Sequence, residues 1–206
     1  MNTRTVAVLI CFTVFCSGSI LGCRKQIIDS TNPPQEIVKP TVQPTPPSTL
    51  NPEMPSDLYP EATRQVAPDF DLPMLDDSGT LALSSLKGKM VLLDFTTTWC
   101  VWCDRQLPQV EDLFKNYKEK GFTVIAVDCR EPKETVLQKY PGGKNPYPVV
   151  LDLDGSVSSN LFNVQGYPFY MLIDKNGKVA YVQSGYKENM YETVSKILDH
   201  LINKEP

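Results

Sequence analysis

Two cysteines between a strand-like run and a helix-like run constrain the fold of this chain more than any other feature. Residues 90–95 read MVLLDF, a continuous apolar run of strand length that suits a buried central strand. Cys100 and Cys103 follow it, and apolar side chains then recur at helical spacing, at Leu107, Val110, Leu113, Phe114 and Tyr117. Gly121 closes this helix, and FTVIAVD gives a second buried strand. Strand, helix and strand in this order predict a parallel βαβ unit.

The other patterned segments predict further strands and helices. Residues 67–89 hold two short apolar runs around Asp77-Ser78-Gly79, which indicates a hairpin. EPKETVLQKY predicts a short helix, PVVLDLDG a strand, and FYMLIDKNGKVAYVQSG a hairpin turning at Asn176-Gly177. YETVSKILDHLI predicts a closing amphipathic helix. This order of elements predicts an α/β fold with a mixed central sheet and helices on both faces.

The first residues have the pattern of an export signal. After MNTR the chain is uncharged through residues 5–23, with the apolar centre VAVLICFTVF. Ile20-Leu21-Gly22-Cys23 resembles the lipobox of bacterial lipoproteins, so we expect residues 1–22 to be removed as a signal peptide and Cys23 to carry lipid. An uncleaved signal anchor is the alternative, because the uncharged run approaches the length of a membrane-spanning helix. Both predict that the remaining chain lies outside the cytoplasm, anchored to a bacterial membrane and facing the periplasm or the cell surface.

A proline-rich segment separates this signal from the patterned part of the chain. Residues 23–66 contain NPPQEIVKPTVQPTPPSTLNPEMPSDLYP, which has no apolar period and favours extended, unpacked backbone. We therefore expect the lipidated cysteine and a flexible tether in residues 23–66, and one folded domain in residues 67–206.

Charge and histidine content exclude several classes of function. The net charge is −4 with a single histidine, His200, in 206 residues. Nucleic-acid surfaces need clustered Lys and Arg, so we expect no nucleic-acid partner. The lone histidine also argues against histidine-based catalysis and metal binding.

The spacing of Cys100 and Cys103 is compatible with several kinds of site. A zinc site needs four ligands, and one further cysteine and one distant histidine do not supply a good second pair. Covalent haem attachment needs CxxCH, but Asp104 follows Cys103. A structural bridge and a working dithiol both remain open. The strand-to-helix junction favours the dithiol, because a helix N-terminus stabilises a thiolate and makes Cys100 the expected nucleophile.

The motif residues resemble those of thioredoxin-like proteins. DFTTTWCVWCDRQLP has Trp99 just before the first cysteine, Pro108 after the second and Asp94 on the preceding strand, as in the thioredoxin active-site region. Residues 164–168, VQGYP, followed by FYMLID, resemble the cis-proline loop, and Gly185 falls where that family has a glycine. The hairpin region and an insertion at residues 131–163, before the cis-proline loop, resemble the TlpA/ResA-like branch of membrane-anchored thiol-disulfide oxidoreductases. A thioredoxin-like fold is therefore expected.

This resemblance implies a mechanism and a set of partners. Cys100 would attack the disulfide of an exported client protein, and Cys103, expected to be less exposed, would resolve the mixed disulfide. Asp94 would be buried with a raised pKa, which suits a proton acceptor for Cys103. Pro168 would follow a cis peptide and expose the backbone of Tyr167 to an extended client segment. A membrane thiol donor would supply electrons, possible clients include apocytochrome c, and we expect a monomer without metal or cofactor.

Some residues near the motif leave finer points open. Trp99 and Trp102 either pack in the core or offer an apolar surface to a partner. TlpA/ResA-like proteins often carry Glu where this chain has Gln106, which cannot take a proton and leaves more of that work to Asp94. Cys129 ends the second strand and is either an inert small hydrophobic residue or a third redox cysteine.

Two other functions compete with disulfide reduction. Peroxiredoxins share an opening like APDFDL, but their peroxidatic cysteine usually follows a Pro-x-x-x-Thr loop, and FTTTWC has no proline there. A non-enzymatic module with Cys100–Cys103 as a structural bridge is the other alternative. The interior of the CxxC motif, Val101-Trp102, does not reveal the redox potential or the direction of electron flow.

Overall fold

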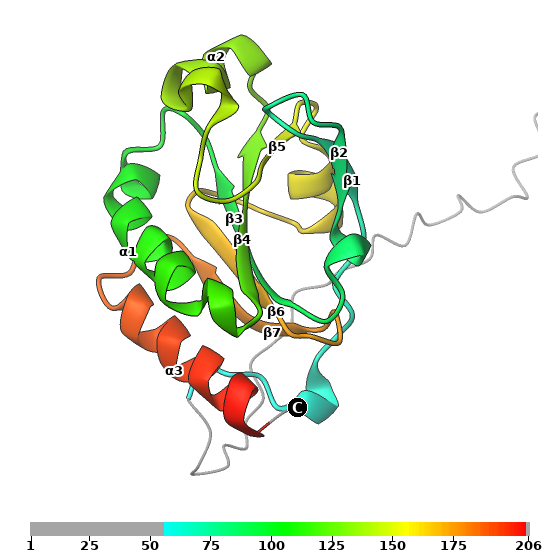
Figure 1. Cartoon of the computed structure of the whole chain (residues 1–206), viewed down its shortest axis with the longest axis vertical. Coiled ribbons are helices and arrows are strands. Elements are labelled where there is room, and N and C mark those ends of the chain that lie inside the picture. Colours follow the sequence, from blue (N-terminus) through cyan, green and yellow to red (C-terminus); the bar gives the residue numbers. More distant parts are fainter. Residues whose placement is uncertain (1–55, 205–206) are drawn as a thin grey trace, which may run out of the picture. The chain divides into compact units, whose positions relative to one another are not determined.

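A five-stranded mixed sheet organises the protein, whose computed structural model describes residues 56–204 (Figure 1). The strand order is β5-β4-β3-β6-β7. Strands β3, β4 and β5 run parallel, and β6 is antiparallel to both β3 and β7. The bounds are β3 Met90–Thr96, β4 Phe122–Cys129, β5 Val149–Asp152, β6 Phe169–Ile173 and β7 Val179–Ser184. The predicted βαβ unit is confirmed, since β3 and β4 are parallel neighbours joined through a helix.

The three α-helices bury their apolar sides on one face of the sheet. Helices α1 (Val101–Tyr117) and α3 (Met190–Lys204) lie side by side along this face, and the short α2 (Lys133–Lys139) lies near its upper end (Figure 1). Their buried residues join one core cluster with alternate residues of β3, β4 and β6. Both long helices show the apolar period of a helix that packs on one side.

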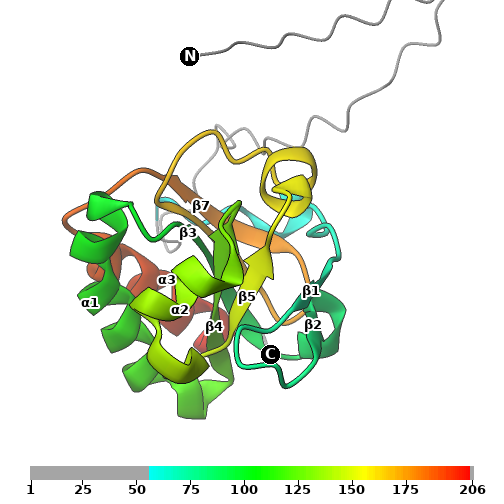
Figure 2. The ribbon, with the colours of Figure 1, turned by 90° about the horizontal axis from the view of Figure 1, so that it is seen from above.

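The opposite face is covered by the predicted hairpin and by short helices. Strands β1 (Asp71–Pro73) and β2 (Thr80–Ala82) form a separate two-stranded sheet (Figure 2). The 3-10 turn η2 (Leu83–Leu86) and the π-helix η5 (Ser156–Leu161) contribute to the second core cluster on this side. Helices therefore contact both faces, but the long ones are all on one.

Three further 3-10 turns connect these elements. They are η1 (Glu61–Thr63), η3 (Lys118–Lys120) and η4 (Pro141–Gly143). Gly121, after η3, has a φ of 81°, a left-handed conformation that favours glycine. This glycine ends the α1 segment, as its place in the sequence predicts.

The packed part of the chain begins before residue 67, where we expected the tether to end. Leu58 is buried, and the Tyr59 amide donates to the carbonyl of Ala180 at 2.8 Å. Arg64 Nη1 forms a buried ion pair with Asp174 Oδ2 at 3.0 Å. Composition predicts extended backbone here, but backbone hydrogen bonds to β7, the buried Leu58 and the Arg64–Asp174 ion pair hold the segment against the sheet.

The predicted signal peptide, Cys23 and most of the tether lie outside the described residues. Within residues 56–204 no helix is long and apolar enough to cross a membrane.

Candidate functional site

Cys100 and Cys103 form a disulfide at the start of α1, directly after the loop that leaves β3. Their Cα atoms are 5.2 Å apart. Cys100 is the N-cap of α1, and the Cys103 amide donates to Cys100 Sγ at 3.1 Å. The first sulfur therefore sits where free amide groups and the positive end of the helix dipole stabilise a thiolate.

The two cysteines are equally buried, which differs from the expected lower exposure of Cys103. Each is 5% exposed. The disulfide holds both side chains within one helical turn, so they share the same surroundings. Exposure therefore does not distinguish the attacking from the resolving sulfur in this oxidised form.

Asp94 lies on β3, on the face that the α-helices cover. It is 5% exposed, and its Oδ1 has no hydrogen-bond partner among the described residues. Burial raises the pKa of this carboxyl to about 7, and the ammonium group of Lys139 opposes that rise. The predicted burial and raised pKa are both present.

The Tyr167–Pro168 peptide bond is cis, as the resemblance implies. Phe169 pairs with Phe95 in the β3–β6 register, so Pro168 lies at the end of the sheet from which the dithiol loop emerges. The Pro168 carbonyl accepts from the amide of Gly185 at 2.8 Å. The rings of Tyr167 and Trp99 meet edge to face, with centroids 6.1 Å apart.

An exposed apolar surface surrounds the disulfide. Trp99 is 69% exposed, Val101 74% and Trp102 53%, so neither tryptophan is a core residue. The Arg105 guanidinium lies 5.5 Å from the ring centroid of Trp102 and 5.2 Å from that of Tyr186. Such exposed aromatic groups, stacked with arginine, are typical of surfaces that contact a partner.

Cys129 is a buried thiol on the opposite face of the sheet from Asp94. It is 1% exposed and belongs to the second core cluster. Its Sγ donates to the carbonyl of Val127 at 3.2 Å, and burial raises its pKa to about 12. A thiolate is strongly disfavoured there, which favours the interpretation of Cys129 as an inert small hydrophobic residue over that of a third redox cysteine.

Gln106 is a buried clamp between α1 and the segment before α3. Its Nε2 donates to the Lys187 carbonyl at 3.0 Å, and its Oε1 accepts from the Lys187 amide at 2.9 Å. Gln109, one turn on, makes the same two bonds to the carbonyl of Glu188 and the amide of Tyr191. An ionised glutamate at this position would have no hydrogen-bond donor for the Lys187 carbonyl, so the amide of Gln106 is needed to make both bonds.

Sequence reasoning missed a second buried carboxyl group near the dithiol. Asp128 on β4 is 1% exposed and shares the helix-covered face with Asp94, while Glu131 accepts from both the amide and the hydroxyl of Thr98 in the dithiol loop. Burial and the Glu131 carboxylate raise the pKa of Asp128 to about 7. The run FTVIAV before Asp128 carries the same signal of a buried strand as MVLL before Asp94.

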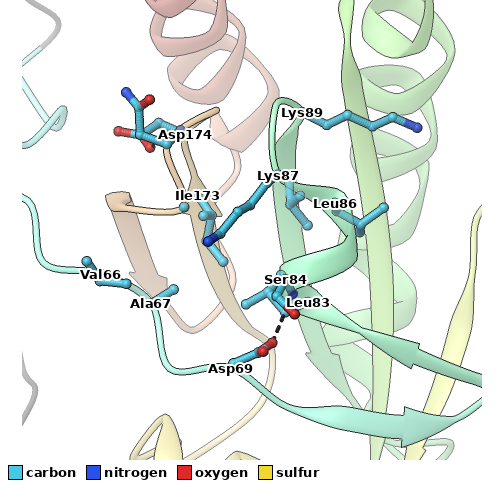
Figure 3. Close-up of a pocket in the computed structure, with 13 residues that line it drawn as sticks. Val66, Ala67, Asp69, Leu83, Ser84, Leu86, Lys87, Lys89, Ile173 and Asp174 are labelled. Carbon is cyan, nitrogen blue, oxygen red and sulfur yellow. Dashed lines mark hydrogen bonds between the residues drawn. The ribbon is translucent and has the colours of Figure 1, made fainter.

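A cavity of about 270 Å³ lies at the opposite end of β3 from the dithiol (Figure 3). Apolar side chains such as Leu83 and Ile173 line it, and Figure 3 shows Lys87 extending across it while Lys89 points away. None of the candidate site residues reaches it. Among residues 56–204, no group of His, Cys, Asp and Glu side chains is arranged to hold a metal ion.

Comparison with known proteins gives matches that cover this folded part. Residues 63–182 match the AhpC/TSA family. Thiol-disulfide oxidoreductase ResA of Geobacillus kaustophilus (strain HTA426) is 38% identical over 119 residues, which cover 58% of this chain and 67% of that protein.

Solved structures give the same result. The thiol:disulfide interchange protein DsbE of Chlorobium tepidum has a TM-score of 0.63 at 30% identity, covering 68% of this chain and 97% of that one. An exposed lipoprotein thioredoxin of Streptococcus pneumoniae strain TIGR4 has a TM-score of 0.54 at 28% identity, covering 65% and 100%. The CxxC disulfide, the cis-proline and the buried acid thus occur in a chain similar to disulfide-exchanging proteins.

Proposed function

From the premise that the chain belongs to the AhpC/TSA family, as a thioredoxin-like thiol-disulfide oxidoreductase of the ResA type, we propose that it reduces disulfide bonds of exported proteins outside the cytoplasm. One observation carries the proposal. The Cys100–Cys103 pair caps the N-terminus of α1 beside the cis peptide at Pro168, with the buried Asp94 on the strand before it.

The attacking role belongs to Cys100 because of its place at the helix N-terminus. In the reduced protein the Cys103 amide and the helix dipole stabilise a Cys100 thiolate, which is the nucleophilic form. This thiolate attacks a client disulfide, forms a mixed disulfide and releases one client thiolate. Cys103 then attacks Cys100 Sγ, the Cys100–Cys103 bond forms, and the second client thiolate leaves with the electron pair.

Asp94 takes the proton of Cys103 in the second step. A carboxyl group with a pKa of about 7 is well matched to a proton acceptor near neutral pH. Gln106 has both ends of its amide engaged with Lys187 and does not share this work.

The exposed residues around the dithiol are proposed to recognise the client. Trp99 and Trp102 offer apolar area, and the backbone of Tyr167 before Pro168 is proposed to pair with an extended client segment, as in other modes of strand addition. Lipid on Cys23 would hold the protein to the membrane, where a membrane thiol donor re-reduces the dithiol. The similarity of the chain to ResA proteins and to an exposed lipoprotein thioredoxin supports this location. Apocytochrome c before haem attachment is one proposed client.

The reduction potential of the dithiol tests the direction of electron flow. The full chain in detergent is equilibrated with glutathione or dithiothreitol buffers, and the Cys100–Cys103 pair is quantified by alkylation and mass spectrometry. A potential near that of thioredoxin, about −270 mV, is expected for a reductase. A potential near about −120 mV would make the protein an oxidant. A pair that stays oxidised and unalkylated in native dithiothreitol would instead identify a structural bridge.

A further inference from the structure

Trp102, Arg105 and Tyr186 form a cluster at the surface beside the disulfide. The guanidinium of Arg105 lies 5.5 Å from the ring centroid of Trp102 and 5.2 Å from that of Tyr186. The two ring centroids are 5.4 Å apart, and the ring planes are inclined by 38°. We name these three side chains the arginine–aromatic cluster, because each packs against the other two.

The arginine–aromatic cluster lies between the dithiol and the cis-proline loop. Trp102 stands between the two cysteines in the first turn of α1. Tyr186 follows Gly185, whose amide donates to the Pro168 carbonyl at 2.8 Å. The side chain of Gln106 bonds the residue after Tyr186 to α1. The cluster is therefore next to both parts of the site that are proposed to hold a client.

The guanidinium of Arg105 has no hydrogen bond and no ion pair within residues 56–204. The other two arginines of this range are engaged by polar side chains, Arg64 by Asp174 and Arg130 by the Ser159 hydroxyl, to which its Nη2 donates at 2.6 Å. Arg105 is exposed, and the two rings hold it from one side. A guanidinium held in this way keeps its planar fork of N–H donors available for a carboxylate.

Nearby acidic side chains do not neutralise Arg105. Asp104, the preceding residue, pairs instead with the ammonium group of Lys139 at 2.7 Å. Glu188 is exposed, and in the described part of the chain it forms no ion pair with Arg105. The whole chain carries a net charge of −4, so the attraction of an acidic segment to this surface depends on local positive charge.

We propose that Arg105 is a specificity-determining residue that binds a carboxylate of the client, so that the protein prefers exported clients with an Asp or Glu close to the cysteine that it attacks. The inference rests on the proposed function. Arg105 is five residues after Cys100, which is a rise of about 8 Å along α1. An extended client segment covers this distance in about two or three residues. The acidic residue is therefore expected about two or three residues from the client cysteine.

The carboxylate takes no part in the electron transfer and acts by holding the client segment beside the dithiol. The Cys100 thiolate attacks one client sulfur, the bond from Cys100 to the client forms, and the other client sulfur leaves with the electron pair. Closure follows, in which Cys103 bonds to Cys100 Sγ and the first client sulfur leaves as a thiolate. An attraction at Arg105 raises the rate of the first step, because it stabilises the encounter of the client with the dithiol.

Peptides with a single cysteine, activated as a neutral 2-pyridyl disulfide, test this preference on the reduced full chain in detergent. Each peptide carries one Glu within about four residues of the cysteine on either side, and a partner peptide has Gln in the same place. Attack by Cys100 forms the bond to the peptide sulfur and releases pyridine-2-thiolate, which takes a proton from water and is measured by its absorbance. Mass spectrometry of acid-quenched samples follows closure, which frees the peptide thiol.

The wild-type protein is expected to react about fivefold faster with the Glu peptide than with its Gln partner at the best position and low salt. This ratio of rate constants should fall toward one as salt is added, since salt screens exposed charges. Arg105→Gln is expected to bring the ratio close to one. Arg105→Lys retains the charge and is expected to retain more of the preference than Arg105→Gln does. The ratio cancels any effect of a variant on the reactivity of Cys100 itself.

Two further variants separate the local contact from net charge. Lys115→Gln removes one positive charge from an exposed position of the same helix, away from the dithiol, and is expected to leave the ratio at its wild-type value. Tyr186→Leu removes one of the two rings that hold the guanidinium and is expected to lower the ratio. An unchanged ratio in Tyr186→Leu would contradict the role of the rings in presenting Arg105.

The outcomes distinguish this inference from the proposed function. Wild-type protein that reacts with no peptide would overturn the proposed function itself. Equal rates with Glu and Gln peptides at every position would overturn the inference alone. A preference for Glu that persists in Arg105→Gln, or that Lys115→Gln abolishes equally, would overturn the assignment to Arg105.

Discussion

Replacing Asp94 by Asn is expected to make the folded protein more stable at neutral and alkaline pH while it slows disulfide exchange. The carboxyl group is buried with an unpartnered oxygen, and an asparagine of nearly the same shape does not ionise. Sites that need a destabilised group for chemistry commonly show this opposition between stability and activity.

The size of the effect follows from the pKa. A carboxyl whose ordinary pKa is 3.8 and whose pKa in the folded protein is about 7 is harder to ionise after folding than before. The wild-type protein therefore carries no such cost well below pH 3.8, loses stability as the pH rises from about 3.8 to about 7, and stays at the lower level above that. The full cost is on the order of 4 kcal/mol. Asp94→Asn removes this pH-dependent cost.

Urea unfolding of the oxidised full chain measures this pH-dependent cost in stability. The free energy of unfolding is compared between wild type and variant at about pH 4 and at about pH 8. The advantage of the variant should be about 4 kcal/mol larger at the higher pH. Any pH-independent packing change caused by the amide cancels in this comparison. Asp112→Asn makes the same chemical change on the exposed side of α1 and should show no such difference.

An equal advantage at both pH values would refute the reasoning, because it would mean that Asp94 is no harder to ionise in the folded protein than in the unfolded chain. The same variant should also slow closure of the mixed disulfide. Unchanged closure across the pH range would remove Asp94 from the proposed mechanism even if the stability result held.

Two further predictions concern Gln106 and the amino-terminal signal. Gln106→Glu should destabilise the protein by about 1–3 kcal/mol in urea unfolding at neutral pH, because an ionised carboxylate leaves the buried Lys187 carbonyl without its hydrogen-bond donor. Gln109→Glu makes the equivalent change at a more exposed position and should lower the free energy of unfolding clearly less. Equal losses in the two variants would contradict this account. The intact mass of the membrane-extracted protein should show a chain that begins at a lipid-modified Cys23, and a full-length chain with an unmodified Cys23 would contradict lipidation.

Local sequence patterns were sufficient for much of the fold and for the centre of the site. The run MVLLDF predicted a buried strand that carries a buried Asp94, and the helical spacing of apolar residues from Leu107 to Tyr117 predicted the helix after it; each is present. These features depend on residues that are close together in the sequence, so the hydrophobic periodicity predicts them directly. The cis peptide before Pro168 is different, because it came only from the resemblance to thioredoxin-like proteins.

The pairing of polar groups between distant elements depended on the tertiary structure. Gln106 contacts Lys187 only because the segment before α3 returns to α1, and Glu131 contacts Thr98 only because the loop after β4 lies beside the dithiol loop. No sequence period records such a meeting, because it depends on the angle and register at which separate elements pack. The sequence by itself determined that a dithiol would stand at a helix N-terminus near a buried acid. Tertiary packing alone decided that a second buried acid, Asp128, lies on the same face of the sheet as Asp94.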